Sequence, residues 1–364
     1  MPPRFTDMDT KKIASAFDFG SPILSVDECL LGHINNTFFV HCQNGSYVVQ
    51  KINTVAFKKP HEVMSNIVRV TDHVREKLRM AGRDAKNGTL EFIKSGDRYF
   101  HVDDEGNHWR VCRFVDGSCF DSCDDPLLFY HAGKAFGEFT SQLSDFDATS
   151  LFEPIPDFHD TVKRYEALER AIQKDACQRA AECEAEIAFI RERKDACSFI
   201  VKGLENGTLP LRVTHSDTKL NNVILNKETG EGLCVIDLDT VMPGSLLCDF
   251  GDAVRYGASA AAEDEEDLSK VFIRTDMFEA YTKGFLAGLN GNITRAEAEA
   301  LTEGARILTL ELAIRFLTDY LEGDVYFRTK GGKHNLIRAR NQIKLVEDIE
   351  KQYETLQAIV KKYL

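Results

Sequence analysis

Residues 213–226 read VTHSDTKLNNVILN, and residues 235–239 read VIDLD. In the first stretch Asp217 and Asn222 stand five residues apart just before an apolar, strand-like run, and Asp237 follows after one more hairpin. A phosphoryl-transfer enzyme requires a carboxylate that accepts the proton of the attacking hydroxyl, and a carboxamide and a second carboxylate that hold Mg²⁺ against nucleotide phosphates. The spacing of these three side chains supplies those groups from adjacent backbone segments.

Each of these residues also has an ordinary structural interpretation. Asp217 would cap a turn, Asn222 would end a strand and Asp237 would be a surface acid at a strand end. The nested pattern His-x-Asp-x4-Asn, followed by Ile-Asp-Leu-Asp, favours the functional interpretation over three coincidences. His215 is expected to brace the loop through hydrogen bonds, and Asp239 would point to the same side of a strand as Asp237, with no role yet assigned.

Composition and charge restrict the class of protein. The 364 residues are 43% hydrophobic and 28% charged, which is typical of a folded protein long enough for two lobes. The net charge of −13 argues against extended contact with nucleic acid or an anionic membrane, because such contact requires a basic face. No apolar leader or membrane-length run is visible, and the ten cysteines lack a metal-binding spacing. We therefore expect a cytoplasmic protein with reduced, mostly buried cysteines, and nothing implies a protein partner.

The first 116 residues are mostly strand-like. Residues 36–42 and 46–52 flank Asn44-Gly45, a strong hairpin signal, and residues 98–103 and 108–115 form a second pair of strands around a polar turn. Apolar residues at helical spacing in 61–82 predict one helix that ends at Gly82.

Beyond residue 116 the pattern becomes mainly helical. The island 211–240 interrupts it with a strand hairpin, and the expected helical runs are 126–144, 160–203, 267–289, 295–322 and 333–363. We therefore expect a lobe boundary near residue 116, with an N-terminal nucleotide-binding lobe over 1–116 and a C-terminal catalytic lobe over 117–364.

Several strings carry a family resemblance. THSDTKLNN (214–222), VIDLDTVMPG (235–244) and CDFGDAVRYGAS (248–259) resemble the catalytic segments of the aminoglycoside phosphotransferase-like kinases, and the similarity extends to GHINNTFFV (32–40) and RFLTDYLEGDVYF (315–327). The resemblance implies an α+β, bilobal protein-kinase-like fold with a small β-rich N-terminal lobe, a larger mainly helical C-terminal lobe, and ATP between them. The longer strings resemble most the members that phosphorylate the anomeric hydroxyl of N-acetylglucosamine or N-acetylgalactosamine.

The resemblance also implies roles for individual residues. Asp217 matches the catalytic base, which also contacts the sugar, and Asn222 and Asp237 match the Mg²⁺ ligands. Arg315 and Tyr326 match sugar-binding positions, although Arg315 would otherwise form an ordinary helical ion pair with Asp319. A related kinase for choline, homoserine or an aminoglycoside is the alternative, and a nucleotide-binding pseudokinase is a third reading.

The expected nucleotide site departs from the kinase pattern. Gly32 is the only glycine of the segment that would cover the phosphates, where Asn36 and Thr37 are further candidates, although a plain hairpin turn fits these residues equally well. Gln50 stands where kinases place a strand lysine. Lys51 follows one step later, so its side chain should point to the opposite face of the sheet.

Two further segments are assigned from their position in the chain. The backbone from Arg113 to Val115 resembles the hinge that meets adenine. Asp249, Phe250 and Gly251 have the sequence of the protein-kinase magnesium motif. The magnesium aspartate of the resembled family follows the catalytic loop after one hairpin, which is the place of Asp237, so we expect Asp249 to brace the loop or to begin a helix. The acidic run 263–267 is expected to be the solvated start of the helix that follows.

Overall fold

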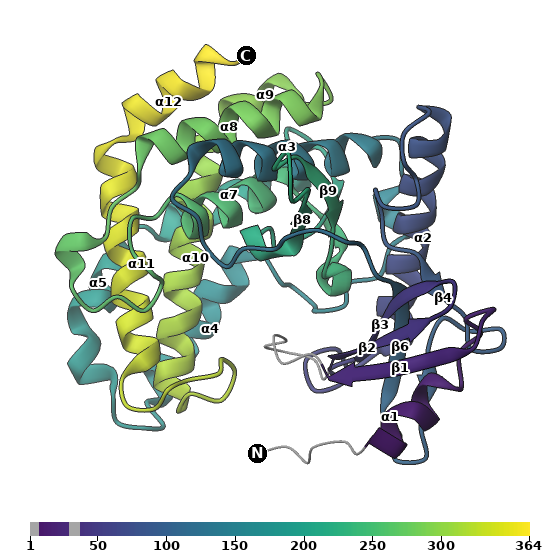
Figure 1. The fold of residues 1–364 in the computed structure, drawn as a ribbon. Helices are drawn as coiled ribbons and strands as arrows, with labels where there is room; N and C mark the ends of the chain where they lie inside the picture. Colours follow the sequence, from purple (N-terminus) through teal and green to yellow (C-terminus); the bar gives the residue numbers. More distant parts are fainter. Residues whose placement is uncertain (1–6, 29–36) are drawn as a thin grey trace.

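The protein is described by a computed structural model that covers residues 7–28 and 37–364. Within this part of the chain, an antiparallel sheet of six strands forms the N-terminal lobe, in the order β1-β2-β3-β6-β4 with β5 also paired to β6 (Figure 1). The strands are β1 (Ile23–Glu28), β2 (Thr37–Cys42), β3 (Gly45–Lys51), β4 (Phe92–Ile93), β5 (His101–Val102) and β6 (His108–Arg113). The predicted hairpin at Asn44-Gly45 is confirmed as the β2–β3 connection.

The two faces of the sheet have different partners. Tyr47 and Val49 of β3 pack with Trp109 and Val111 of β6 in a small core that includes α1 (Asp7–Ala14). Because strand side chains alternate, the intervening residues face the other way. We call that side, with Val48, Gln50, His108, Arg110 and Cys112, the inner face; it is turned toward α2 and the helical lobe.

Helix α2 (Pro60–Met80) forms over the predicted range. Its apolar stripe, at the positions expected from helical spacing, is buried, and the chain turns away at Gly82 with a φ of 67°. These α2 side chains belong to the same continuous core as the helical lobe. The two lobes are therefore joined by apolar packing as well as by the connecting chain.

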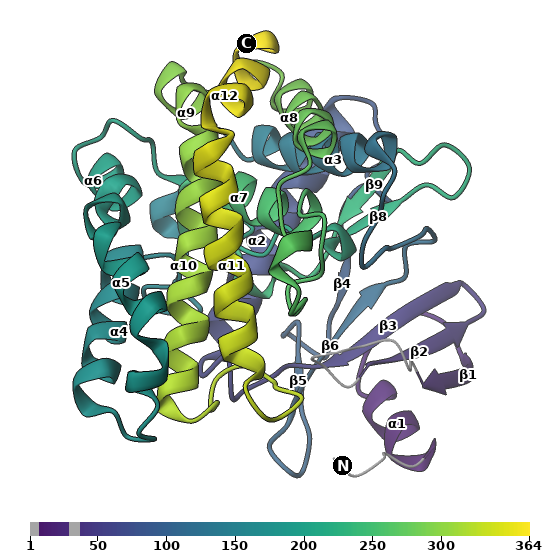
Figure 2. The same cartoon turned by 90° about the vertical axis from the view of Figure 1, so that its left-hand side faces the viewer.

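The C-terminal lobe is mainly helical (Figures 1 and 2). Its helices are α3 (Pro126–Gln142), α4 (Thr161–Lys174), α5 (Glu184–Glu192), α6 (Phe199–Glu205), α7 (Leu246–Gly257), α8 (Thr275–Leu289), α9 (Arg295–Glu299), α10 (Leu301–Glu322), α11 (His334–Lys351) and α12 (Tyr353–Lys362). Glycines allow α3 and α8 to pack with their backbones in contact: a β-carbon built at Gly137 would lie 2.2 Å from the carbonyl oxygen of Phe285. The proposed boundary near residue 116 falls between the end of β6 and the start of α3, and it stays a prediction.

Several helical ranges were predicted as too continuous. Residues 160–203 form α4, α5 and α6 separated by 3₁₀ turns, residues 295–322 form α9 and α10, and residues 333–363 form α11 and α12. The run 263–267 does not begin a helix, because α8 begins only at Thr275. Glu263 is partly buried instead, and its carboxylate pairs with Arg255 at 2.7 Å and Arg338 at 3.2 Å, contacts that the local sequence does not reveal.

The described cysteines are mostly buried, as expected. Six of the nine are buried: Cys42, Cys112, Cys183, Cys197, Cys234 and Cys248. None of the helices formed by residues 7–28 and 37–364 combines the length and apolarity that a bilayer crossing demands.

Candidate active site

A braced loop carries the predicted base. It runs from β7 (Arg212–Thr214) to the 3₁₀ turn η4 (Leu220–Asn222) and β8 (Val223–Leu225). The buried carboxylate of Asp249, in the first turn of α7, accepts the backbone N–H groups of His215 at 2.9 Å and Ser216 at 2.7 Å. These bonds hold Ser216 in a left-handed conformation with a φ of 66°. The prediction that Asp249 braces the loop is confirmed.

His215 contributes a second brace, as predicted. Its imidazole is fully buried, with Nε2 2.8 Å from the carbonyl oxygen of Ile236 and Nδ1 accepting the N–H of Asp217 at 3.2 Å. Since Nδ1 accepts from Asp217, Nε2 is the ring nitrogen that donates to the carbonyl oxygen of Ile236. His215 thereby connects the loop to the segment that contains Asp237.

Two neighbours fix the carboxylate of Asp217. Lys219 lies 2.8 Å from Oδ1, and the side-chain amide of Asn222 donates to Oδ2 at 3.1 Å. Burial alone would raise the pKa of Asp217, but the charge and hydrogen bond of Lys219 outweigh it and lower the pKa below its ordinary value. Asp217 is therefore ionised at neutral pH. Sequence reasoning missed Lys219, although its position two residues after Asp217 was a usable signal.

The two predicted metal ligands flank this carboxylate. The Asn222 amide nitrogen donates to the backbone oxygen of Asp217 at 2.8 Å, which leaves the Asn222 side-chain oxygen available as a ligand. Asp237 lies just past β9 (Gly232–Val235) with a left-handed φ of 58°, and it precedes the 3₁₀ turn η5 (Leu238–Thr240). Burial and the carboxylates of Asp239 and Asp217 raise the pKa of Asp237 to about 6, an accumulation of negative charge that a cation would relieve.

These donors fit Mg²⁺ in the way that nucleotide enzymes hold it. Within the described chain, no group of three or more His, Cys, Asp or Glu side chains is arranged to hold a metal by itself. Mg²⁺ commonly takes one or two carboxylates and completes its shell with phosphate oxygens and water. One carboxylate from Asp237 and one carboxamide oxygen from Asn222 match that requirement.

Asp239 does not follow the strand geometry expected for it. It lies in η5, and its buried carboxylate forms an ion pair with Arg110 of β6. The Nε of Arg110 also donates to the side-chain oxygen of Gln50 at 3.2 Å. Sequence reasoning missed Arg110, because the contact with Asp239 joins residues 129 positions apart.

The structure places the other predicted nucleotide-binding residues as follows. Gly32 and Asn36 lie outside the described residues. Thr37 pairs with Gln50 across β2 and β3. The side chain of Arg113 points to the outer face, where its Nε donates to the Glu91 carboxylate at 2.8 Å, and its backbone N–H donates to the carbonyl oxygen of Glu91 at 2.8 Å, so neither group is available to adenine.

Val115 closes this segment. Its side chain is buried in the main core, and the preceding amide of Phe114 is already occupied by the carbonyl oxygen of Ser46 at 2.9 Å. The hinge assignment therefore rests on backbone groups from Val115 onward.

Arg315 and Tyr326 come together at one end of α10. The Arg315 guanidinium lies over the rings of Phe158, Tyr326 and Phe327, at 4.8, 5.8 and 5.5 Å from their centres. The alternative helical pair with Asp319 does not form, because that carboxylate instead accepts the backbone amides of residues 325–327. Arg315 faces Glu311 at 3.8 Å, one turn earlier in the helix.

A buried relay connects this cluster to the catalytic loop. His159 contacts Glu311 through Nδ1 at 2.8 Å and the backbone oxygen of Ser216 through Nε2 at 3.2 Å. Ser216 immediately precedes Asp217. The aromatic cluster around Arg315 is thus positioned relative to the predicted base by side chains of the helical lobe.

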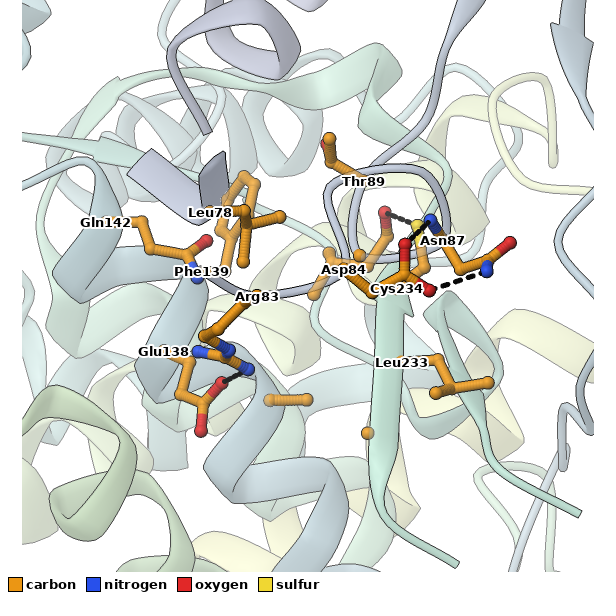
Figure 3. A pocket seen from close by; sticks show the side chains of 14 residues that line it. Leu78, Arg83, Asp84, Asn87, Thr89, Glu138, Phe139, Gln142, Leu233 and Cys234 are labelled. Carbon is orange, nitrogen blue, oxygen red and sulfur yellow. Dashed lines mark hydrogen bonds and ion pairs between the residues drawn. The ribbon is translucent and has the colours of Figure 1, made fainter. Parts of the chain in front are cut away.

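Two cavities lie apart from the predicted catalytic residues. One, of about 150 Å³, lies between the segment after α2, α3 and β9, and its lining includes an ion pair of 2.6 Å between Arg83 and Glu138 (Figure 3). Another, of about 420 Å³, lies behind the catalytic loop against Thr214 and Ser216. Neither is lined by Asp217, Asn222 or Asp237, so we assign no role in the reaction to them.

The fold and the loop together define a class: a bilobal, kinase-like phosphotransferase, in which a small antiparallel sheet stands beside a helical lobe that carries paired acidic segments. A model of the phosphotransferase enzyme family APH matches residues 28–279, most of the chain, and the protein belongs to that family. The predicted fold class is confirmed.

Solved structures support the same architecture. Spectinomycin phosphotransferase APH(9)-Ia, in complex with ADP and spectinomycin, superposes with a TM-score of 0.58 at 13% identity, covering 98% of this chain and 100% of that one. Choline kinase from Cryptosporidium parvum gives a TM-score of 0.56 at 12% identity, covering 93% and 92%. An aminoglycoside phosphotransferase from Alicyclobacillus acidocaldarius gives 0.56 at 11% identity, covering 100% and 98%. At these identities the similarity concerns the fold alone.

Proposed function

We propose that this phosphotransferase is an N-acetylhexosamine 1-kinase, which uses ATP and Mg²⁺ to phosphorylate the anomeric hydroxyl of N-acetylglucosamine or N-acetylgalactosamine. The observation that carries the proposal is the stacking of Arg315 within three aromatic rings at the end of α10. Aromatic faces and guanidinium donors together suit a neutral sugar, since the rings cover its apolar face and the donors bind its oxygens.

The proposed reaction follows from the arrangement around Asp217. Its carboxylate, ionised and oriented by Lys219 and Asn222, accepts the proton of the anomeric hydroxyl. The sugar oxygen forms a bond to the γ-phosphorus as the bond from that phosphorus to the β-γ bridging oxygen breaks, which leaves ADP. Mg²⁺, held by Asn222 and Asp237, would neutralise charge on the phosphates. A hemiacetal hydroxyl is more acidic than an ordinary alcohol, so this acceptor demands less of the base.

The same cluster argues against the main alternative substrates. An alkylammonium such as choline requires an aromatic or acidic cage. Here a permanently charged guanidinium already lies against Phe158, Tyr326 and Phe327, and it would repel a second cation. The acidic partner Glu311 is buried and bound to His159 and Thr161, at 2.8 and 2.6 Å. A neutral polyol acceptor fits this charge pattern better than an amine.

The proposal is tested by a panel of acceptors with Mg-ATP, scored for ADP release and for the chemistry of the product. N-acetylglucosamine or N-acetylgalactosamine should be the best acceptor, and glucose and galactose should be much poorer, because a site built for the N-acetyl group would leave buried polar groups unpaired. The 1-phosphate must also lose its reducing-sugar reactivity, whereas a 6-phosphate would keep it.

Two outcomes would contradict the proposal. ADP release that depends on choline, homoserine or an aminoglycoside, and not on N-acetylhexosamines, would identify a kinase of another specificity. Nucleotide binding without turnover on any acceptor would identify a pseudokinase. The Asp217→Asn variant is the control, since it removes the base from the same fold.

A further inference from the structure

The inner face of the sheet carries an unexpected cation. The registers of β3 against β2 and of β3 against β6 are continuous, so Gln50 pairs directly with Arg110, and Lys51 pairs with Trp109 on the outer face. Lys51 therefore cannot point to the side from which Arg110 reaches Asp239. His108 shares the inner face, but burial and the neighbouring His61 lower its pKa, which leaves it neutral. Arg110 is thus the cation that β3 and β6 present toward the helical lobe.

The surroundings of Arg110 hold its guanidinium in one orientation. Arg110 is only 3% exposed and Asp239 only 4%. Nη1 bonds Asp239 and Nε donates to Gln50, whereas Nη2 makes no hydrogen bond to any residue that the structure describes. Asp239, to which Nη1 is bonded, lies two residues after the proposed metal ligand Asp237.

In protein kinases a glutamate of the helix beside the sheet pairs with the strand lysine. The acids of α2 pair with other cations. Glu62 lies 2.9 Å from Lys59, Asp72 lies 2.5 Å from Arg75, and Glu76 faces Arg79 at 3.8 Å. Each acid is occupied by a cation three residues away in the sequence. The buried carboxylate that orients the inner-face cation comes instead from η5, through Asp239.

We propose that Arg110 binds the phosphate chain of the nucleotide, in place of a strand lysine, with Asp239 and Gln50 as its positioning residues. This inference rests on the proposed use of a nucleoside triphosphate, but not on the identity of the acceptor. A guanidinium presents several N–H donors in a plane, so it can bond two side chains and still donate to a phosphate oxygen. Because its partner Asp239 follows Asp237 by two residues, the cation and the proposed metal ligand would serve the same part of the nucleotide.

The test measures nucleotide binding without any sugar. Calorimetric titrations with Mg-ADP, and competition by adenosine, are compared for wild type, Arg110→Gln and Lys51→Gln. Arg110→Gln should weaken ADP binding by about 10- to 100-fold, the loss expected for a hydrogen bond to a charged group. Adenosine carries no phosphate, so its affinity should change by less than about twofold. Lys51→Gln is the matched control from the opposite face, and it should leave ADP affinity within about twofold of wild type.

A second variant separates phosphate binding from a purely structural role. Arg110→Gln leaves Asp239 buried without its cation, which can destabilise the lobe. The double variant Arg110→Gln with Asp239→Asn restores a neutral pair, and it should recover the urea midpoint but not the ADP affinity. Recovery of ADP affinity would show that Arg110 only neutralises Asp239, and would overturn the proposal. An equal loss for ADP and adenosine, or a loss confined to Lys51→Gln, would overturn it too.

The role of Arg110 and the identity of the acceptor can be tested separately. If wild type binds Mg-ADP with the expected Arg110 dependence but phosphorylates no N-acetylhexosamine, the role of Arg110 stands and the substrate assignment falls. If wild type binds neither ADP nor a guanine nucleotide, both proposals fail.

Discussion

Replacing Asp237 with Asn is expected to stabilise the metal-free protein while weakening its use of Mg²⁺. Burial, Asp239 and Asp217 raise the pKa of Asp237 from 3.8 to about 6, and Arg110 offsets only part of this. Above that pH the folded protein carries an ionised carboxylate that is less costly in the unfolded chain. Asn keeps the shape and one oxygen but removes the charge.

The difference between a pKa of 3.8 and one of about 6 corresponds to about 3 kcal/mol of unfolding free energy. The folded-state pKa is the higher one, so the folded protein binds the extra proton between pH 3.8 and about 6, and the unfolding free energy of wild type falls as the pH rises through that window. Asp237→Asn should therefore gain about 2–3 kcal/mol near pH 7.5 and about half as much near pH 5.

The assay is urea unfolding at both pH values without divalent metal, followed by Mg²⁺ titration in the presence of ADP. Mg²⁺ should stabilise wild type by mass action and have much less effect on the variant. Asp249→Asn is the contrasting variant: burial also raises the pKa of Asp249, but its two oxygens accept two backbone amides, and Asn can accept only one of them, so this substitution should reduce stability at both pH values. An Asp237→Asn variant no more stable than wild type near pH 7.5, or a gain that does not shrink near pH 5, would refute the reasoning.

Four further substitutions test the predicted base, its neighbouring cation, the proposed acceptor site and the contact between α3 and α8. Asp217→Asn should lower kcat by about 10²–10⁴-fold with nucleotide affinity nearly intact, and a variant with half of wild-type activity would exclude Asp217 as the base. Lys219→Met removes the cation that lowers the pKa of Asp217, so the acidic limb of the kcat/KM profile should move to higher pH; an unmoved limb would contradict this. Arg315→Gln should raise the KM for the sugar and leave that for ATP unchanged, and the opposite pattern would remove Arg315 from the acceptor site. Gly137→Ala should destabilise the α3–α8 contact by about 1–3 kcal/mol or more, measured by urea unfolding, because its β-carbon would meet a backbone oxygen at 2.2 Å; an unchanged midpoint would refute this.

Local features of the fold were predictable because their causes lie within a few residues. The β2–β3 hairpin follows from Asn44-Gly45 between two β-rich runs, and α2 follows from helical spacing with a glycine stop at Gly82. The acidic run 263–267 was misassigned because the partners of Glu263 lie on α7 and α11. Helix propensity carries no information about such partners.

The order of the predicted catalytic segments was readable in the sequence alone. His215, Asp217 and Asn222 act on one another over at most seven residues, so their spacing already determines that they share a loop. The bracing role of Asp249 was inferred correctly from its position in the chain, one segment after Asp237.

Only the tertiary structure revealed Arg110 and the partners of Arg315, whereas Lys219 lies in the loop itself, two residues after Asp217. Arg110 meets Asp239 across 129 residues, and Arg315 meets Phe158 from another helix. Which strand residue points inward depends on the register of β3 against β6, and which carboxylate it meets depends on how the helical lobe packs against the sheet. The sequence by itself therefore determined the acidic loop and its nearest cation, Lys219, because their contacts are local, whereas the pairing of Arg110 with Asp239 was decided by the packing of distant segments.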